Sequence, residues 1–189
     1  NKGFAKGFAK PDLDESDWKP MKLPQHIEDA GLMIDGAIWF RKEVDIPAEW
    51  AGKALSVQLG GIDDEDTTYF NGKQIGRSAS IWSIFVQRDY TVPAGDAKAG
   101  KAVIAVRVFD KGGAGGFYGS PIQMKITVAG DDAIKPISLA GQWKYKVEKS
   151  WPQPTKPPPR PAVPAPANAT SLASNIYNAM VYPLIPYGS

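Results

Sequence analysis

The sequence predicts an all-β fold, an antiparallel β-sandwich of the jelly-roll type. Hydrophobic and polar residues alternate through much of the first 150 positions, and this two-residue period is typical of strands with one face toward a core. Glycine, proline and Asn-Gly sequences separate the alternating stretches, as expected for short strands joined by turns. No amphipathic helical pattern of any length precedes residue 150. Together these observations favour a sandwich over a helical or mixed fold.

The alternating stretches predict strands at 38–46, 54–59, 67–70, 73–76, 101–110, 121–128 and 142–148. In the first of them, Ile38, Phe40 and Val44 share one face with a single charge, Lys42. Asn71-Gly72 separates the third stretch from the fourth. It predicts a two-residue hairpin, because a type I′ turn needs positive φ at both central residues.

The chain of 189 residues is long enough for one domain with a proper core and would be short for two. Residues 1–10 hold Lys-Gly-Phe-Ala twice and are interpreted as a lead-in to a jelly-roll domain over 11–150. Residues 151–170 are dominated by proline and predict an extended linker or strap. Residues 171–189 predict a short helix that ends before Pro183. It cannot bury its own apolar face alone, so we expect it to return toward a neighbouring domain or the sandwich flank.

Composition excludes several classes of site. The net charge of +2 gives no reason to expect nucleic acid or an anionic membrane as a partner. No cysteine is present, which removes disulfides, thiolate catalysis and Cys-based zinc sites. The one histidine, His26, has no nucleophile motif around it. A Ser-His-Asp triad within this chain is therefore not expected.

Four consecutive acids, from Asp63 to Asp66, precede the predicted hairpin. Adjacent acids in one loop point apart, which argues against a catalytic carboxylate pair facing across a sugar. They do not fit the glycine and glutamate spacing of an EF-hand loop. Calcium bound by Asp63, Asp64 and Asp66 stays open, since Asp is a hard oxygen ligand. The favoured interpretation is a solvated loop in which Asp63 or Asp66 accepts hydrogen bonds from backbone amides.

Two irregular stretches carry candidate ligand-binding residues. In the first, Asp110 stands at the base of a glycine-rich loop and Phe117 and Tyr118 at its tip. Aromatic faces stack on sugar rings and carboxylates bind hydroxyl pairs, although a long mobile connection would explain the loop equally well. The second stretch holds Trp82, a stacking platform or a core residue, followed by Arg88.

Two long blocks, 38–76 and 90–116, resemble the sugar-binding-like jelly roll of family 2 glycoside hydrolases. Lys101-Ala102 departs from that pattern, which usually has Asn after the preceding glycine. The matching residues include Gly100 to Val108 and also Trp39, Phe40, Arg41, Pro47, Trp50, Gly52, Gly60, Asp63, Tyr69, Asn71, Gly72, Lys73 and Gly76.

From residue 11 to residue 187 the chain resembles a particular setting of this module, the jelly roll inserted into sialate O-acetylesterases and related carbohydrate acetylesterases. The stretches that carry this likeness are "DLDESDWKPMKLP", "FDKGGAGGFYGSP", "ISLAGQWKYKV" and "NIYNAMVYPLIPY". Those esterases are similar to SGNH hydrolases, and the blocks that hold their nucleophilic Ser and their Asp/His pair are missing from this chain.

The resemblance implies a non-catalytic accessory domain that binds carbohydrate or shapes the rim of the esterase active site. Its implied partners are a glycan, either sialic acid or an acetylated hemicellulose, and the SGNH esterase domain of a periplasmic or secreted parent. No cofactor is implied, with calcium left open. Two alternatives remain: a purely structural insert that braces the esterase halves, and a hydrolase with an unrecognised site that depends on His26.

Overall fold

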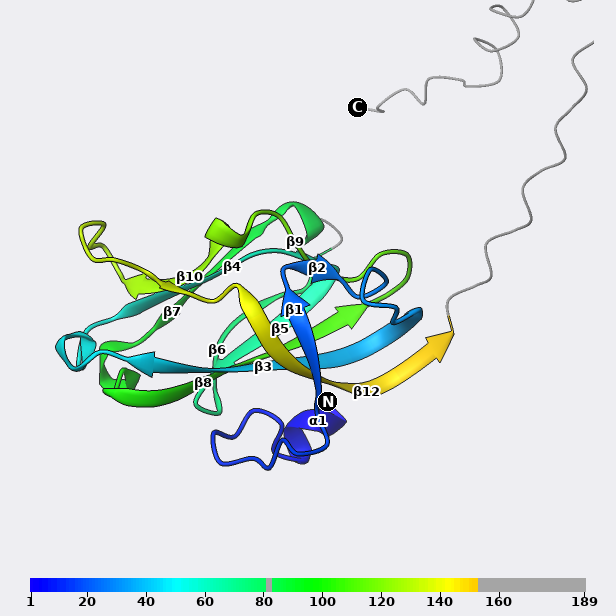
Figure 1. Cartoon of the computed structure of the whole chain (residues 1–189), viewed down its shortest axis with the longest axis horizontal. Helices are drawn as coiled ribbons and strands as arrows, with labels where there is room; N and C mark the ends of the chain where they lie inside the picture. The colour runs from blue at the N-terminus through cyan, green and yellow to red at the C-terminus, as the bar shows by residue number, and fades with distance from the viewer. Residues whose placement is uncertain (81–82, 153–189) are drawn as a thin grey trace, which may run out of the picture. The chain divides into compact units, whose positions relative to one another are not determined.

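The computed structural model describes residues 1–80 and 83–152 of the chain. It confirms the antiparallel β-sandwich (Figure 1). The strands are β1 (Lys19–Leu23), β2 (Gln25–His26), β3 (Ile34–Ile46), β4 (Leu55–Asp63), β5 (Glu65–Phe70), β6 (Lys73–Ser78), β7 (Gln87–Val92), β8 (Gly100–Asp110), β9 (Gly116–Tyr118), β10 (Met124–Val128), β11 (Ile137–Ser138) and β12 (Gly141–Pro152). The helical turns are α1 (Lys2–Ala5), η1 (Ala48–Trp50), η2 (Ser83–Phe85), η3 (Ala94–Asp96) and η4 (Pro121–Gln123).

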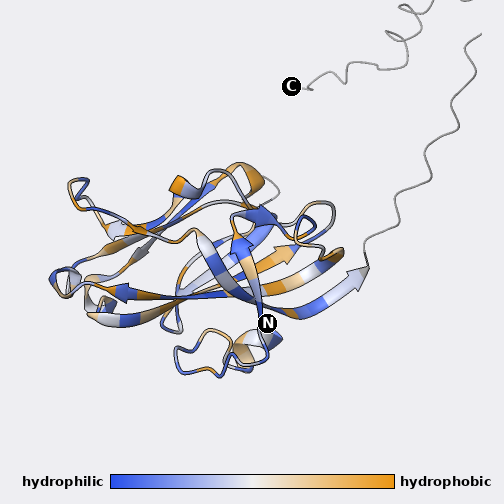
Figure 2. Cartoon of the chain, viewed as in Figure 1, coloured by the Kyte–Doolittle hydropathy of each residue, from blue (hydrophilic) through white to orange (hydrophobic). Residues whose placement is uncertain are grey.

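Two six-stranded sheets form the layers of the sandwich. Sheet A has the order β1-β12-β3-β8-β5-β6. Sheet B has the order β11-β10-β4-β9-β2, with β7 also paired to β4. Every pairing is antiparallel. Apolar and polar residues alternate along the strands (Figure 2), as the sequence predicts for a sheet with one face toward a core.

The main core lies between the two sheets. Sheet A contributes fully buried side chains that include Ile38, Phe40 and Val106, and sheet B contributes residues such as Val57 and Phe117. Each such side chain removed from water contributes about 1.5–3 kcal/mol before the entropy of folding is subtracted. Because the apolar residues recur at every second position, their burial decides which face of each strand points toward the core.

The Asn71-Gly72 hairpin is confirmed. Asn71 has a φ of 47° and Gly72 a φ of 82°, and the two residues join β5 to β6. The Asn71 side-chain oxygen also accepts a hydrogen bond from the Val103 amide at 2.8 Å. This contact fixes the tip of the hairpin to β8, so β5, β6 and β8 form one connected surface.

The first 18 residues form a partial third layer on the outer face of sheet A (Figure 1). Phe8 is 6% exposed and packs edge-on against Trp18 and Trp39 at 5.2 and 5.9 Å between ring centroids. Arg41, pointing outward from β3, donates to the Phe8 carbonyl and to Glu15, both at 2.6 Å. Both faces of the middle of β3 are therefore buried, and residues 1–10, interpreted from sequence as a lead-in, pack against the sandwich.

β12 runs to Pro152, slightly beyond the predicted end of the jelly roll. The rest of the predicted strap at 151–170 and the predicted helix at 171–189 lie outside the described residues. Among the helical turns of residues 1–80 and 83–152, none has the length and apolar character needed to cross a membrane.

Candidate functional site

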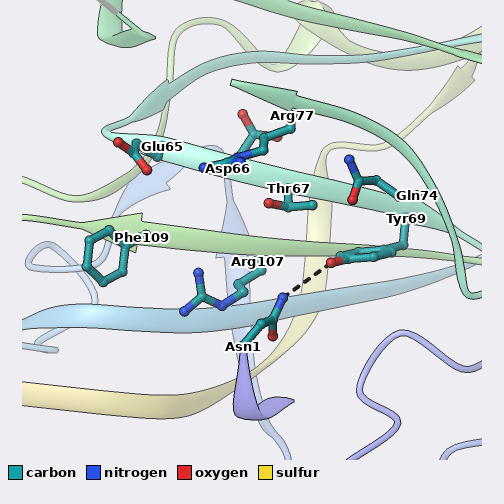
Figure 3. Close-up of a pocket in the computed structure, with 9 residues that line it drawn as sticks. All are labelled: Asn1, Glu65, Asp66, Thr67, Tyr69, Gln74, Arg77, Arg107 and Phe109. Atoms are coloured by element: carbon teal, nitrogen blue, oxygen red, sulfur yellow. Dashed lines mark hydrogen bonds between the residues drawn. The ribbon is translucent and has the colours of Figure 1, made fainter. Parts of the chain in front are cut away.

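A pocket opens on the part of the outer face of sheet A that the N-terminal layer leaves uncovered (Figure 3). Strands β5, β6 and β8 form its floor, and its volume is about 310 Å³. Most of the lining side chains are polar, with two aromatic rings among them. They are Asn1, Glu65, Asp66, Thr67, Tyr69, Gln74, Arg77, Arg107 and Phe109.

Strand register places two arginines on either side of a threonine. Thr67 on β5 lies directly opposite Arg77 on β6 and directly opposite Arg107 on β8. Residues opposite one another in neighbouring strands point to the same face, and Figure 3 shows Thr67 between the two arginines. With strands about 4.8 Å apart, the two arginine Cα atoms stand roughly 10 Å apart. Two guanidinium groups and a hydroxyl therefore share one row of the pocket floor.

An irregularity in the hairpin is responsible for the position of Arg77. A regular two-residue hairpin that pairs Phe70 with Lys73 would put Gly76 opposite Thr67. The register shifts between Thr68 and Tyr69, so Arg77 takes that place instead. An extra residue in one strand moves all later side chains to the other face. The bulge thus turns Arg77 toward the pocket.

Arg107 is held in place by Glu148 of β12. Its Nε donates to Glu148 Oε2 at 2.9 Å and its Nη2 to Oε1 at 3.3 Å. The Trp39 indole and the Lys2 amide also donate to this carboxylate, at 2.6 and 3.1 Å. Burial alone would raise the pKa of Glu148, but the Arg107 and Trp39 hydrogen bonds outweigh it and lower the pKa to about 2. Glu148 is therefore ionised at neutral pH and balances the charge of Arg107.

The two acids of the pocket are also balanced. Glu65 pairs with Lys111 at 2.5 Å, and Asp66 pairs with Arg88 at 2.8 Å. Within the part of the chain that the structure describes, the exposed Arg77 side chain makes no hydrogen bond or ion pair. Among the charged side chains that line the pocket, Arg77 is thus the one without an ionic partner in the described residues.

Aromatic rings bound the pocket at both ends. Tyr69 stacks on Phe4 and Trp39, with centroid distances of 5.3 and 5.4 Å, and its hydroxyl accepts from Asn1 at 3.3 Å. Half-buried Phe109 lies 5.6 Å from the Arg107 guanidinium carbon. Tyr69 is only 4% exposed, so half-buried Phe109 provides the accessible apolar face of the pocket. A polar ring-shaped ligand requires such a face beside hydrogen-bonding side chains.

Arg88, a sequence candidate for ligand binding, is 1% exposed. Its guanidinium donates to the Asp66 carboxylate and to the Ile62 carbonyl, both at 2.8 Å, and to the Asp64 carbonyl at 3.0 Å. Thr68 and Tyr90 also donate to Asp66. The expectation of a fully solvated acidic loop is therefore wrong for Asp66, which is 2% exposed. The pair binds sheet A to β7 of sheet B.

Phe117 lies in the core rather than at an open loop tip. It has no exposed surface and packs against Phe40 and Trp143, at centroid distances of 5.2 and 6.0 Å. Its position on β9, paired with both β2 and β4, turns it inward. Tyr118, the next residue, faces outward, and a Cβ on Gly61 would come within 2.3 Å of its ring. Tyr118 keeps partial exposure, and a contact with ligand there stays a prediction.

Asp110 is fully buried beside the glycine-rich loop. Its Oδ1 accepts from the Gly112 amide at 2.9 Å, whereas Oδ2 has no hydrogen-bond partner among the described residues. Burial raises the pKa of Asp110 to about 7, and the nearby charges of Asp35, Glu28 and Asp64 act in the same direction. The carboxyl cannot reach a ligand at the surface in this arrangement.

Asp63 and Asp64 stand at the same end of the sandwich. Asp64 Oδ2 accepts from the Lys111 amide at 2.8 Å, a contact to backbone that the sequence predicts for Asp63 or Asp66 instead. Burial, followed by the interaction with Asp64, raises the pKa of Asp63 to about 6. Across residues 1–80 and 83–152 no group of three or more acids and histidines is arranged to hold a metal ion. Asp66, the third calcium candidate, is already engaged by Arg88.

The pocket row of Thr67, Arg77 and Arg107 was not predicted from the sequence. Thr67 and Arg107 fall within predicted strands, and Arg77 lies one residue beyond the predicted strand at 73–76. The Asn71-Gly72 hairpin signal predicts that Thr67 lies opposite Gly76, the residue before Arg77. The bulge shifts the pairing by one residue and places Arg77 opposite Thr67. Trp82, the remaining candidate, lies outside the described residues. His26 is partly exposed and stands 4.0 Å from Asp29.

No protein-family model matches the chain, and no curated protein matches it. Solved structures with a similar fold include β-glucuronidase 2 of Bacteroides uniformis, with 19% identity, a TM-score of 0.50, and coverage of 76% of this chain and 16% of that one. A glycosyl hydrolase family 2 member of Bacteroides cellulosilyticus has 23% identity and a TM-score of 0.49, and the match covers 58% of this chain and 17% of that one. The β-glucuronidase of Ruminococcus gnavus has 20% identity and a TM-score of 0.49, with coverage of 77% of this chain and 26% of that one.

The chain therefore spans between about a sixth and a quarter of the length of these structures. At such low identity the similarity shows the fold alone. The fold is a β-sandwich of the kind found within family 2 glycoside hydrolases, in agreement with the first of the two resemblances in the sequence.

Proposed function

We propose that this chain is a non-catalytic carbohydrate-binding domain of a larger carbohydrate-active enzyme. The observation that carries the proposal is the open pocket of sheet A. There the side chains of Thr67, Gln74 and Arg77, between two aromatic rings, make no hydrogen bond or ion pair within residues 1–80 and 83–152. Sugars offer hydroxyl groups around an apolar ring face, so they match a site of this composition.

The parent enzyme is, in this proposal, a periplasmic or secreted O-acetylesterase of the SGNH type, acting on sialate or hemicellulose esters. Four separate blocks of the sequence, in the order found in those esterases, support this. The domain would hold a glycan near the active site or shape its rim, and the nucleophile would come from the esterase domain. The solved structures with the same fold are parts of glycoside hydrolases, which also act on carbohydrate.

A purely structural role is the second candidate, and two observations favour it. Phe117 is a core side chain, and Arg88 is engaged by Asp66 and by three backbone carbonyls. Two of the five ligand-binding candidates from the sequence are thus explained by packing and an internal ion pair. In this account the sandwich braces the two halves of an esterase and binds no sugar.

Calorimetric titration of the 189-residue chain decides between the two. The ligands are N-acetylneuraminic acid, glucuronic acid, and acetylated xylan and xyloglucan oligosaccharides. We expect saturable binding of at least one sugar, weakened by Gln74→Ala and Thr67→Val in the pocket floor and unchanged by Thr127→Val on sheet B. A protein with native circular dichroism that binds none of these ligands would favour the brace.

A further inference from the structure

We propose that the sheet A pocket selects sugars that carry a carboxylate, which Arg77 binds with Arg107 as the second donor. This inference rests on the proposed function and names the ligand class for the same site. It follows from the charge balance of the pocket and from the row formed by Arg77, Thr67 and Arg107.

The charge balance singles out Arg77. Three of the four charged side chains that line the pocket are already paired: Glu65 with Lys111, Asp66 with Arg88, and Arg107 with Glu148. The carboxylates in the pocket wall therefore do not repel a second anion with their full charge. Arg77 is exposed and makes no ion pair within residues 1–80 and 83–152.

The geometry suits a planar anion. A guanidinium presents N–H groups in a fixed fork that matches the two oxygens of a carboxylate. Thr67 stands between the two arginines and can donate its hydroxyl to the same group. The side chains of Gln74 and Asn1 lie on the Tyr69 side of this row, where they can bind the hydroxyls of the sugar ring.

Arg107 is fixed in its place before any ligand arrives. Glu148 holds its Nε and Nη2, and the carboxylate of Glu148 is itself only 7% exposed. A donor that is already ordered loses little conformational entropy on binding. Arg77 supplies the net charge and Arg107 an ordered donor, so the two arginines contribute differently to the same contact.

The test compares pairs of ligands that differ at the carboxylate, which is replaced by a neutral group in the second member of each pair. We would titrate the chain with methyl glucuronide and methyl glucoside, and with N-acetylneuraminic acid and its methyl ester, at low and high salt. The acid of each pair is expected to bind about tenfold or more tightly, with the advantage reduced by salt because the Arg77 contact is solvent-exposed.

Variants distinguish a direct contact between Arg77 and the ligand carboxylate from a general effect of the protein's net charge. Arg77→Gln should abolish the preference for the acid while neutral sugars still bind, and Arg77→Lys should restore part of it, since lysine keeps the charge without the fork. Lys53→Gln, an exposed residue outside the pocket, removes the same unit of charge and should leave the preference intact. Thermal unfolding of each variant verifies that it is folded.

Three results would overturn the inference, and they differ in what they leave standing. Equal affinity for the acids and the neutral sugars would reject carboxylate selection and leave a carbohydrate-binding domain standing. The second result is that the folded wild-type chain binds none of the four ligands and none of the acetylated oligosaccharides. This would reject the proposed function and this inference with it. An acid preference that Arg77→Gln leaves unchanged would place the anion site elsewhere.

Discussion

Arg107 and Glu148 are joined by two hydrogen bonds, from Nε at 2.9 Å and from Nη2 at 3.3 Å, and they link β8 to β12 across the intervening β3. The Trp39 indole and the Lys2 amide also donate hydrogen bonds to the Glu148 carboxylate. This one acid therefore holds together three strands of sheet A and the N-terminal layer.

Glu148→Gln is expected to lower the free energy of unfolding at pH 7 by about 2–3 kcal/mol, since one pKa unit corresponds to roughly 1.4 kcal/mol. The folded pKa of about 2 lies below the ordinary value of 4.5. The stabilisation is thus present above about pH 4.5 and is lost as the pH falls toward 2. Urea unfolding of both proteins at pH 7 and pH 3 measures it. Glu43→Gln, in an exposed pair with Lys101, should change nothing measurable, and equal effects of the two substitutions would contradict this account.

Asp110→Asn is expected to stabilise the protein at pH 8. The folded pKa of about 7 lies above the ordinary 3.8, so the folded state holds this proton more tightly than the unfolded chain. The stability contributed by Asp110 therefore falls as pH rises from about 4 to 7, and the full penalty applies above 7. The asparagine removes the buried charge, and we expect a gain of at least about 1 kcal/mol at pH 8. Thermal unfolding between pH 5 and 8 provides the measurement. A loss of stability at pH 8 would mean that the ionised carboxylate has a binding partner.

Arg88→Met should cost about 3–5 kcal/mol, because it leaves the Asp66 carboxylate buried without its partner. Adding Asp66→Leu should recover much of that loss, since two apolar side chains then replace the pair. Guanidinium unfolding of the single and double variants gives the two values. Native-like stability of Arg88→Met combined with lost sugar binding would instead support the ligand-binding role predicted from the sequence.

Phe4 and Phe8 hold the same place in the repeated Lys-Gly-Phe-Ala and have different surroundings. Phe8 is 6% exposed and Phe4 is 50% exposed. Phe8→Ala should cost about 3 kcal/mol, as expected for a packed aromatic ring, and Phe4→Ala less than about 1 kcal/mol. Urea unfolding of the two variants makes a matched comparison within one segment. Equal and small losses would show that residues 1–10 do not pack on sheet A in solution.

Most of the sandwich could be predicted from the sequence because the two-residue period marks a strand that is buried on one face only. β7 could not be predicted in this way, for a definite reason. Its inward positions include Arg88, a charge that the core accommodates through Asp66, and no local pattern indicates such a partner. The middle of β3 could be predicted only for its inner face, since the residues that cover its outer face come from a segment without any strand or helix signal.

The pocket could be predicted only in part. Thr67, Arg77 and Arg107 are separated by up to 40 positions in the sequence, and they meet through the order of strands in sheet A. The hairpin signal at Asn71-Gly72 indicates which strand pairs with which, but a single-residue bulge decides whether Arg77 or Gly76 faces the ligand side. Phe117 was predicted as a ligand-binding residue although it lies in the core. The glycine-rich sequence around it suggested an open loop, whereas the residue lies on β9, which directs its ring inward.

Strand β6 is the last strand of sheet A, and in the described residues it pairs with β5 only. Its outer backbone edge could accept a strand from a second molecule, the first step toward aggregation. Lys73 on this strand is paired with Asp96, whereas exposed Arg77 makes no ion pair among the described residues, so the Arg77 charges of two such edges repel each other on approach. Replacing Arg77 by an apolar residue would therefore reduce the solubility of the protein at high concentration as well as the charge of the pocket.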